Sequence, residues 1–297
     1  MILFLSTGKQ IRGDLILSAT VRSDLAPVPL TLEADIRTDD DLLKRLAEGE
    51  TLTLAGSDVL RIIKSEPSPS RDSQGEHDTS AVRITALLDA CHKLAFVRDR
   101  AIVKEGTALS AIYRAAGATL RGIDADFPVP RFTCLAGDTP TFHVSRVLQE
   151  EGGVVRWKAG KLHFFRLTDL FKQRVAMTLP PNIGGEVDSG FIERHEVPWF
   201  YSLTASGGFS FGDRSKARAA RFSPHKDASR LRNLSRCLVL RKTPKIDPAW
   251  QLAAGDLIQM KGGEVLVVIT AAHVFQSGSD GTGSNQYTRL WLGSLEE

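Results

Sequence analysis

Apolar and polar positions alternate along several short segments of this chain, which is the pattern of half-buried β-strands. LILSATV (15–21) and PLTLEADI (29–36) alternate in this way around a proline-containing corner. A short helix is expected over 41–47, because the aspartates at 39–41 can cap its first turn. The first part of the chain therefore reads as mostly β.

The same pattern occurs twice, 206 positions apart. Residues 41–65 (DLLKRLAEGETLTLAGSDVLRIIKS) align without a gap to residues 247–271 (DPAWQLAAGDLIQMKGGEVLVVITA). The identical pairs are Asp41 and Asp247, Leu46 and Leu252, Ala47 and Ala253, Gly49 and Gly255, Gly56 and Gly262, Val59 and Val265, Leu60 and Leu266, and Ile63 and Ile269. Residues 81–87 fall on 287–293 in the same register. Each copy predicts a hairpin followed by a return strand, with Gly56 and Gly262 as candidate structural turns.

The middle of the chain has helical spacing instead. A helix is expected over 106–117, with Thr107 as its N-cap, and another over 139–153. The second runs into a hairpin that turns at 159–160. The predicted fold is mainly β with an α+β insert, in which two duplicated β-barrel-like tube domains flank a small α+β domain. The expected boundaries are 1–95, 96–172 and 173–297.

Two long polar loops, 65–80 and 273–285, occupy equivalent places in the two copies. They are either solvated loops or segments that become ordered against a neighbouring ring or subunit. Composition adds little, since 42% hydrophobic and 25% charged residues are ordinary for a globular protein. Three scattered cysteines favour a reduced site of synthesis. No run approaches the roughly 20 apolar residues of a membrane helix, so no membrane insertion is expected.

Catalytic signatures are missing. The motifs HExxH, GxxxxGK[ST], GxSxG and GxGxxG are all absent. The remaining candidates are Cys91-His92, His143 with His163, and Glu150-Glu151. Cys91 and His92 are neighbours, and neighbours on a strand point to opposite faces, so they do not form a thiolate–imidazole pair. His143 and His163 lack a third metal ligand. Glu150 and Glu151 are expected to form a solvated helix end. No catalytic, metal or cofactor-binding residue is therefore named, no cofactor is expected, and the chain is not expected to be an enzyme.

One stretch, 213–236, is strongly basic, although the net charge of +3 is weak. It is either a solvated outer surface, a contact face for an acidic partner subunit, or a nucleic-acid site that lacks an interleaved aromatic ladder. The candidate partner contacts are Arg214, Lys216, Arg218, Arg221, Lys226, Arg230 and Arg232.

Two segments resemble the hub proteins of phage tails, which include the late control protein D family, contractile-tail baseplate hubs and the first part of the type VI secretion spike protein. FHVSRVLQEEGGVVRWKAGKLHFF (142–165) looks like the family's helix that ends in Glu and Gly before a short hairpin. The segment 252–293 is similar to the family's closing pattern. Its matching positions are Gly255, Asp256, Gly263, His273, Tyr287 and Thr288. Many relatives continue into a spike stem or lysozyme-like module; this sequence ends at Glu297, which favours a compact hub.

The resemblance implies a structural baseplate hub in a virion tail, made in the host cytoplasm. Three chains would place six β-units around one axis and join a sixfold tail tube to a threefold spike. The implied partners are further copies in a homotrimer, the tail tube protein, the central spike protein, surrounding baseplate proteins and the tape measure protein, with DNA only passing through the lumen.

Two other functions remain open from the residues. One is a monomeric carbohydrate- or nucleic-acid-binding β module. Its candidate stacking surfaces are Trp157, Trp199, Trp250 and Trp291. The other is a degenerate tail-associated hydrolase that uses His143, Glu150 and His163, which requires these three side chains to converge in one cleft.

Overall fold

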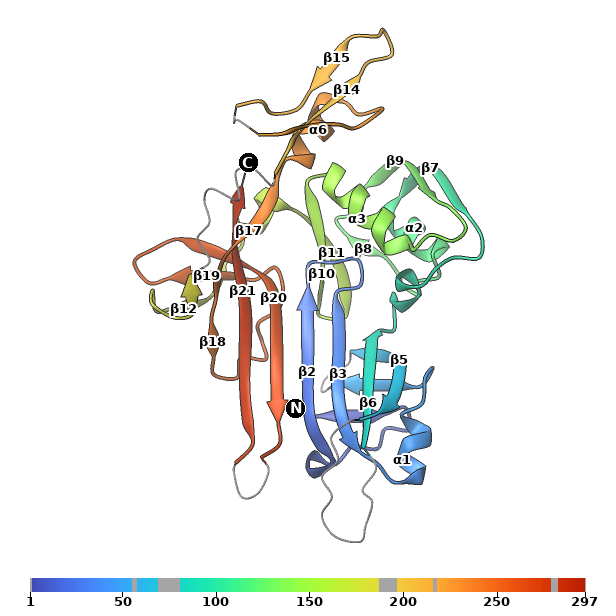
Figure 1. The fold of residues 1–297 in the computed structure, drawn as a ribbon, viewed down its shortest axis with the longest axis vertical. Coiled ribbons are helices and arrows are strands. Elements are labelled where there is room, and N and C mark those ends of the chain that lie inside the picture. The colour runs from blue at the N-terminus through green and yellow to red at the C-terminus, as the bar shows by residue number, and fades with distance from the viewer. Residues whose placement is uncertain are drawn as a thin grey trace.

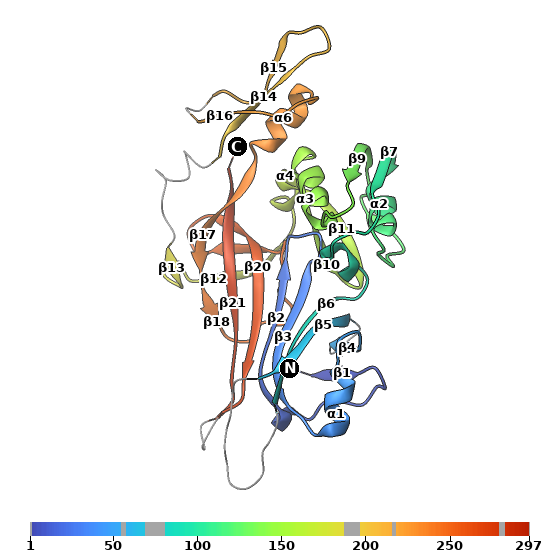
Figure 2. The same cartoon turned by 45° about the vertical axis from the view of Figure 1, so that its right-hand side comes forward.

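The computed structural model describes residues 2–54, 58–68, 81–186, 197–215, 218–278 and 283–296. A thirteen-stranded sheet forms the long body of the molecule (Figure 1). A small α+β insert lies beside one end of this sheet, and a three-stranded arm projects beyond the same end (Figures 1 and 2). The predicted fold class, mainly β with an α+β insert, is confirmed.

The first half of the sheet is a meander of three strands extended on both sides. Its elements are β1 (Leu3–Leu5), η1 (Gly13–Leu15), β2 (Ile16–Asp24), β3 (Leu30–Arg37), α1 (Asp40–Arg45), β4 (Thr51–Leu54), β5 (Val59–Pro67) and β6 (Ala81–Leu88), followed by η2 (His92–Ala95). Buried side chains alternate with less buried ones along β3 and β6, so one face of these strands packs into the core. Asp39 accepts a hydrogen bond from the Leu42 N–H at 2.7 Å and caps α1, as its position in the sequence predicts.

The second half contains a matching meander with different neighbours. Its elements are β12 (Val175–Leu179), β13 (Gly185–Glu186), β17 (Cys237–Thr243), β18 (Lys245–Ile246), β19 (Leu257–Met260), β20 (Val265–Gln276) and β21 (Asn285–Glu296). β19, β20 and β21 follow one another as β4, β5 and β6 do, whereas β12 pairs with β19 in parallel. The meander is thus the repeated unit, and the strands around it differ.

The strands of the two meanders pair in the same register. β19 begins 206 residues after β4 (257 − 51), and β20 begins 206 residues after β5 (265 − 59). Leu52 pairs with Leu60, and the equivalent Ile258 pairs with Leu266. The gap-free alignment of the sequence therefore corresponds to a repeated pattern of strand pairing.

Even an irregularity is repeated. The β5–β6 ladder has a bulge between Ile62 and Lys64. The β20–β21 ladder has its bulge between Val268 and Thr270, again 206 residues later. A bulge inserts one extra residue and bends the strand, so the two meanders share their curvature as well as their pairing.

The two halves are joined edge to edge by β2 and β20. Residues 18–24 pair antiparallel with residues 270–276. Side chains reinforce the ladder, because the Thr270 hydroxyl donates to the Asp24 carboxylate at 2.6 Å and the Ala254 N–H donates to the Ser23 hydroxyl at 2.9 Å. The repeated units therefore share one continuous sheet.

The insert packs three helices against short strands. Its elements are β7 (Ile102–Ala108), α2 (Leu109–Ala115), β8 (Ile123–Asp124), β9 (Pro128–Cys134), α3 (Pro140–Glu150), β10 (Gly153–Lys158), β11 (Lys161–Arg166) and α4 (Leu167–Leu170). The predicted N-cap at Thr107 is wrong. β7 extends to Ala108, which pairs with Pro128, so the helix starts later and Ala108 takes the cap position.

The arm consists of β14 (Trp199–Leu203), β15 (Phe209–Phe211), β16 (Ala220–Phe222) and α6 (Ala228–Leu234). β14 is the central strand and pairs with β15 on one side and β16 on the other. The basic stretch 213–236 contributes β16 and α6 to this arm. Figure 2 shows the arm standing clear of the thirteen-stranded sheet.

The turn between β19 and β20 contains Gly262, whose φ is +72°; Gly56, its equivalent, lies outside the described residues. A Cβ at Gly262 would meet no atom within 4 Å, so a side chain there is disfavoured by the backbone conformation alone.

We expect Gly262→Ala to lower the free energy of unfolding by about 1–2 kcal/mol, the usual cost of a left-handed backbone for an L-residue. Urea unfolding of the purified protein measures this. Gly263→Ala is the matched control, because Gly263 has no positive φ and a Cβ there makes only an ordinary contact with Met260 at 3.5 Å. Equal losses in the two variants would contradict the explanation.

Candidate assembly surfaces

The three residues of the hydrolase hypothesis do not converge. His143 and Glu150 line a pocket of about 390 Å³ between the insert and the arm, but His163 is not among its lining residues. His163 lies on β11, where its Nδ1 is 3.2 Å from the Asp124 carboxylate. Within the described ranges, no group of three or more His, Cys, Asp or Glu side chains could hold a metal ion.

Cys91 and His92 also differ from a catalytic pair. Cys91 is buried and precedes η2, so the two residues lie at a 3-10 helix and not on a strand as the sequence suggested. Burial raises the pKa of the Cys91 thiol to about 12, which keeps it protonated and unreactive. His92 donates its Nδ1–H to the Asp89 carbonyl, 2.7 Å away, so this proton is engaged by the backbone and not by the thiol.

The carboxylates at the end of α3 are not a solvated helix end, which corrects that expectation. Lys226 Nζ lies 2.7 Å from Glu150, and Arg230 lies 3.3 Å from Glu151. Arg166 of the insert approaches Glu151 from the other side at 3.4 Å. Only 13% and 17% of the two glutamate side chains are exposed, because the basic arm covers them.

Six of the seven candidate contact residues lie in the described ranges, and they fall into two groups. Lys226 and Arg230 bind the insert, and Arg218 binds Glu296 at 2.8 Å with 4% of its side chain exposed. Arg214, Arg221 and Arg232 are exposed, and Lys216 lies outside the described residues. The basic stretch thus attaches the arm to the rest of its own chain through one group and presents cations to solvent through the other.

One face of the arm carries apolar side chains, called here the aromatic face. By strand alternation and pairing it consists of Trp199, Tyr201, Leu203, Phe209, Phe211 and Phe222. The rings contact one another, with centroid separations from 5.4 to 6.1 Å. Phe209 is 61% exposed and Phe222 is 50% exposed. Arg214 lies over the Phe211 ring at 4.3 Å, so a cation borders this surface.

The other face of the arm is covered by α6. Ser202 is fully buried there and accepts a hydrogen bond from the Lys226 N–H at 3.2 Å. α6 in turn lies against α3, where Asn233 donates to the Glu150 carbonyl at 3.0 Å. The alternation Trp-x-Tyr-x-Leu and Phe-x-Phe was readable in the sequence, but the face that α6 covers was not.

The hairpin β10–β11 of the insert holds both repeated units at once. Trp157 Nε1 donates to Asp58, in the turn between β4 and β5, at 2.8 Å. Its neighbours Arg156 and Lys158 donate to Asp256, in the second unit, at 3.1 and 2.9 Å. Alternation places Trp157 on one side of the strand and the two cations on the other. Three consecutive residues therefore bridge the two halves.

Asp256 breaks the symmetry of the repeat. Its equivalent in the first unit is Glu50, which is exposed, whereas Asp256 is 5% exposed. The neighbouring Gly255 lies so close to Arg156 that a Cβ would be 2.7 Å from the Arg156 Cδ, while a Cβ at the equivalent Gly49 would meet nothing. The insert therefore packs closely on the second unit at Gly255 and Asp256, whereas the equivalent positions of the first unit, Gly49 and Glu50, are exposed.

A pocket of about 460 Å³ lies along this seam and includes Trp157, Trp250 and His273. Trp250 is 43% exposed and stacks on the His273 ring at 4.9 Å. His273 Nε2 is 3.0 Å from the Leu252 carbonyl, which can only accept, so Nε2 carries the proton. Nδ1 then accepts from the Thr288 hydroxyl at 3.0 Å. The neutral ring satisfies both contacts, and burial lowers the pKa of His273.

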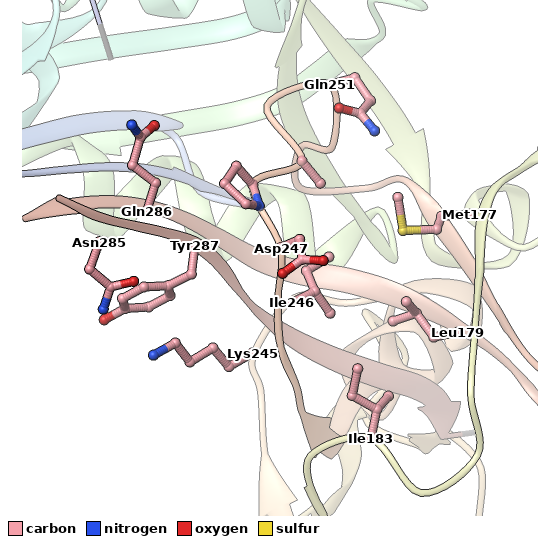
Figure 3. A pocket seen from close by; sticks show the side chains of 12 residues that line it. Met177, Leu179, Ile183, Lys245, Ile246, Asp247, Gln251, Asn285, Gln286 and Tyr287 are labelled. Carbon is pink, nitrogen blue, oxygen red and sulfur yellow. The ribbon is translucent and has the colours of Figure 1, made fainter. Parts of the chain in front are cut away.

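A groove of about 590 Å³ opens at the side of the second unit (Figure 3). Met177, Leu179 and Ile183 form one wall, and Lys245 and Tyr287 stand on the opposite side. Lys245 Nζ lies 3.9 Å from the centre of the Tyr287 ring. The segment 246–251 that borders the groove corresponds in the repeat to α1.

The chain is similar to known proteins in structure and not in sequence. No family model matches the chain, and no curated protein matches its sequence. A tail protein from Neisseria meningitidis MC58 has a similar structure, with a TM-score of 0.66 at 12% identity, over 99% of this chain and 95% of that one. The 43 kDa tail protein of prophage MuSo2 from Shewanella oneidensis gives a TM-score of 0.58 at 13% identity, over 98% and 95%.

A component of a bacterial secretion system shares the same fold. The E. coli c3393 protein, a component of the type VI secretion system with structural similarity to T4 phage tail proteins gp27 and gp5, gives a TM-score of 0.58 at 11% identity. The match covers 95% of this chain and 74% of that one. The resemblance to the phage tail hub family is therefore confirmed at the level of the fold. None of the helices in the described ranges is long and apolar enough to span a membrane.

We expect Asp256→Ala to lower the free energy of unfolding by about 3–5 kcal/mol, because it leaves the buried Arg156 guanidinium without its carboxylate. Glu50→Ala at the equivalent exposed position is the matched control and should change stability by less than about 0.5 kcal/mol. Chemical denaturation of both variants measures the difference. Similar effects in the two would show that Asp256 does not hold the insert.

We expect stability to fall with acidification because of His273. Its pKa in the folded protein lies below the usual 6.5 since burial disfavours the charged ring. This contribution is fully present above pH 6.5 and is lost as the pH falls through the folded-state pKa. The melting temperature of His273→Asn should therefore be lower at pH 7.5 but decline less between pH 6.5 and pH 5. His225→Asn, at an exposed position, should retain the wild-type decline.

Proposed function

We propose that this chain is a structural, non-enzymatic baseplate hub of a phage tail or phage-like injection device. In this proposal, units at 1–95 and 173–297 are the duplicated tube domains and 96–172 is the domain between them. Three chains form a ring with six β-units, which joins a sixfold tail tube to a threefold spike. The fold shared with tail proteins supports the class, and the repeat supports the symmetry.

The observation that carries the proposal is the identical strand register of the two meanders, bulge included. Two equal units within one chain present nearly equal surfaces at two successive places. Three such chains around an axis repeat these surfaces six times, while the insert and the arm occur three times. A ring of this kind can match a sixfold partner on one side and a threefold partner on the other.

The expected partners follow from that arrangement. They are two further copies of the chain, the tail tube protein, the central spike protein, surrounding baseplate proteins and the tape measure protein. The place of action is the virion tail, and DNA passes only through the lumen. The exposed cations Arg214, Arg221 and Arg232 remain candidate contacts, while Arg218, Lys226 and Arg230 already bind carboxylates of this chain.

A second candidate is a monomeric binding module for carbohydrate or single-stranded nucleic acid. The aromatic face of the arm favours it, because exposed rings bordered by Arg214 can stack on a sugar or base. In that case the duplicated register would have no role in assembly. The two functions predict different masses in solution.

We expect light scattering to give three times the chain mass of 32.5 kDa, alone or with the neighbouring tail proteins, and class averages to show a six-lobed ring with a central channel. Three chains are expected because each supplies two lobes. A chain that remains monomeric with every tail partner and binds an oligosaccharide or single strand would replace the hub with the binding module.

A further inference from the structure

The strand pairing that joins the two units within the chain is not readily repeated between one chain and the next. Within the chain, the part of β20 beyond its bulge pairs with β2. The equivalent part of β5, residues 65–67, has no strand on that side among the described residues.

That edge is already blunted. The Ser68 N–H donates to the Ala81 carbonyl of β6, so by alternation residues 65 and 67 direct their N–H positions outward. The Ser65 N–H is bound by the Glu48 carboxylate at 3.4 Å. Residue 67 is a proline and has no N–H, whereas its equivalent, His273, pairs with Val21. Proline on an edge strand opposes the addition of another strand. This stretch of β5 is therefore unsuited to accept a strand of another chain, and side-chain surfaces are the alternative contact between chains.

The aromatic face of the arm is one unpartnered apolar surface. Because α6 lies between the sheet of the arm and α3, the aromatic face is directed away from the insert of its own chain. Phe209 is 61% exposed and Phe222 is 50% exposed, and both belong to one contiguous cluster of rings. Single exposed apolar residues are common on protein surfaces, whereas a contiguous exposed apolar patch is typical of an interaction site. Each such ring can bury about 150–250 Å² in a contact.

The insert presents a second apolar surface, called here the insert corner. It consists of Phe96, Val97, Leu135 and Phe142, which are 45%, 64%, 57% and 68% exposed. The segments that carry them are tied together, because the Arg98 N–H donates to the Asp138 carbonyl and the Gly137 N–H donates to the Arg98 carbonyl. Asp99 is exposed beside this corner, and Arg214 is exposed beside the aromatic face.

Building on the ring of the proposed function, we propose that the aromatic face of one subunit packs on the insert corner of the next. Two different patches on one chain make a head-to-tail contact, which closes a ring when the rotation permits. Among the described residues, no segment of the same chain covers the exposed rings of the aromatic face or the exposed side chains of the insert corner. Self-pairing of aromatic faces would bring two Arg214 side chains together, whereas the rim of the insert corner is mixed, with Asp99 exposed beside Arg100; this favours the pairing of the two different surfaces.

The test is a photo-cross-link in the full-length chain. Phe209 is replaced by p-benzoylphenylalanine, the assembled protein is irradiated, and the cross-linked peptides are identified by mass spectrometry. We expect cross-links between subunits that end in residues 96–99 or 135–142. The same photoreactive residue at Leu43, which is 43% exposed on α1, is the control and should not reach these segments.

Substitutions provide a second measurement. Phe209→Ser and Phe142→Ser should each raise the concentration for half-assembly at least tenfold, while Leu43→Ser leaves it unchanged; far-ultraviolet circular dichroism checks that each variant is folded. A trimer that cross-links elsewhere and tolerates both substitutions overturns the contact but leaves the hub function standing. A wild-type chain that stays monomeric with its tail partners overturns both.

Discussion

The antiparallel ladder between β2 and β20 is the constraint on which the rest of the structure depends. It pairs residues 18–24 with residues 270–276, which come from opposite ends of the chain. The loop that this ladder closes contains the whole insert and the arm, and the entropic cost of closing such a loop grows only slowly with its length. Once formed, the ladder converts two repeated units into one sheet and fixes the angle between them.

The insert adds what backbone pairing alone does not supply. A ladder resists separation along its hydrogen bonds, but it permits twisting about the strand axis. The hairpin β10–β11 opposes such twisting because Trp157 holds Asp58 of the first unit while Arg156 and Lys158 hold Asp256 of the second. The buried ion pair is costly to desolvate, so its value lies in specifying one arrangement of the two units. α6 and α3 then extend this arrangement to the arm through Lys226 and Arg230.

The repeated meander was predictable because its signal is local. Turn glycines, alternating apolar positions and an unbroken alignment indicate the strands and their common register without reference to the rest of the chain, whereas the two bulges were not predicted. The β2–β20 joint was not predictable, since any edge strand with the same alternation could have been chosen. For the same reason the partners of Asp256 were hidden: its carboxylate is equivalent to that of exposed Glu50, and only tertiary packing distinguishes them. The cap at Thr107 failed because strand pairing overrode a local preference.

The difference between Pro67 and His273 follows from placing two equal units in one chain. Equal units have equal edges, and an open edge able to accept a strand would add further chains without limit. His273 lies where the edge is occupied by β2, so a residue with an N–H is required there. Pro67 lies where the same side of the strand has no partner strand among the described residues, so an outward N–H there could pair with an added strand. The near-symmetry of the backbone is therefore combined with asymmetry in its side chains, which favours strand pairing at the joint within the chain and disfavours it at the equivalent stretch of β5.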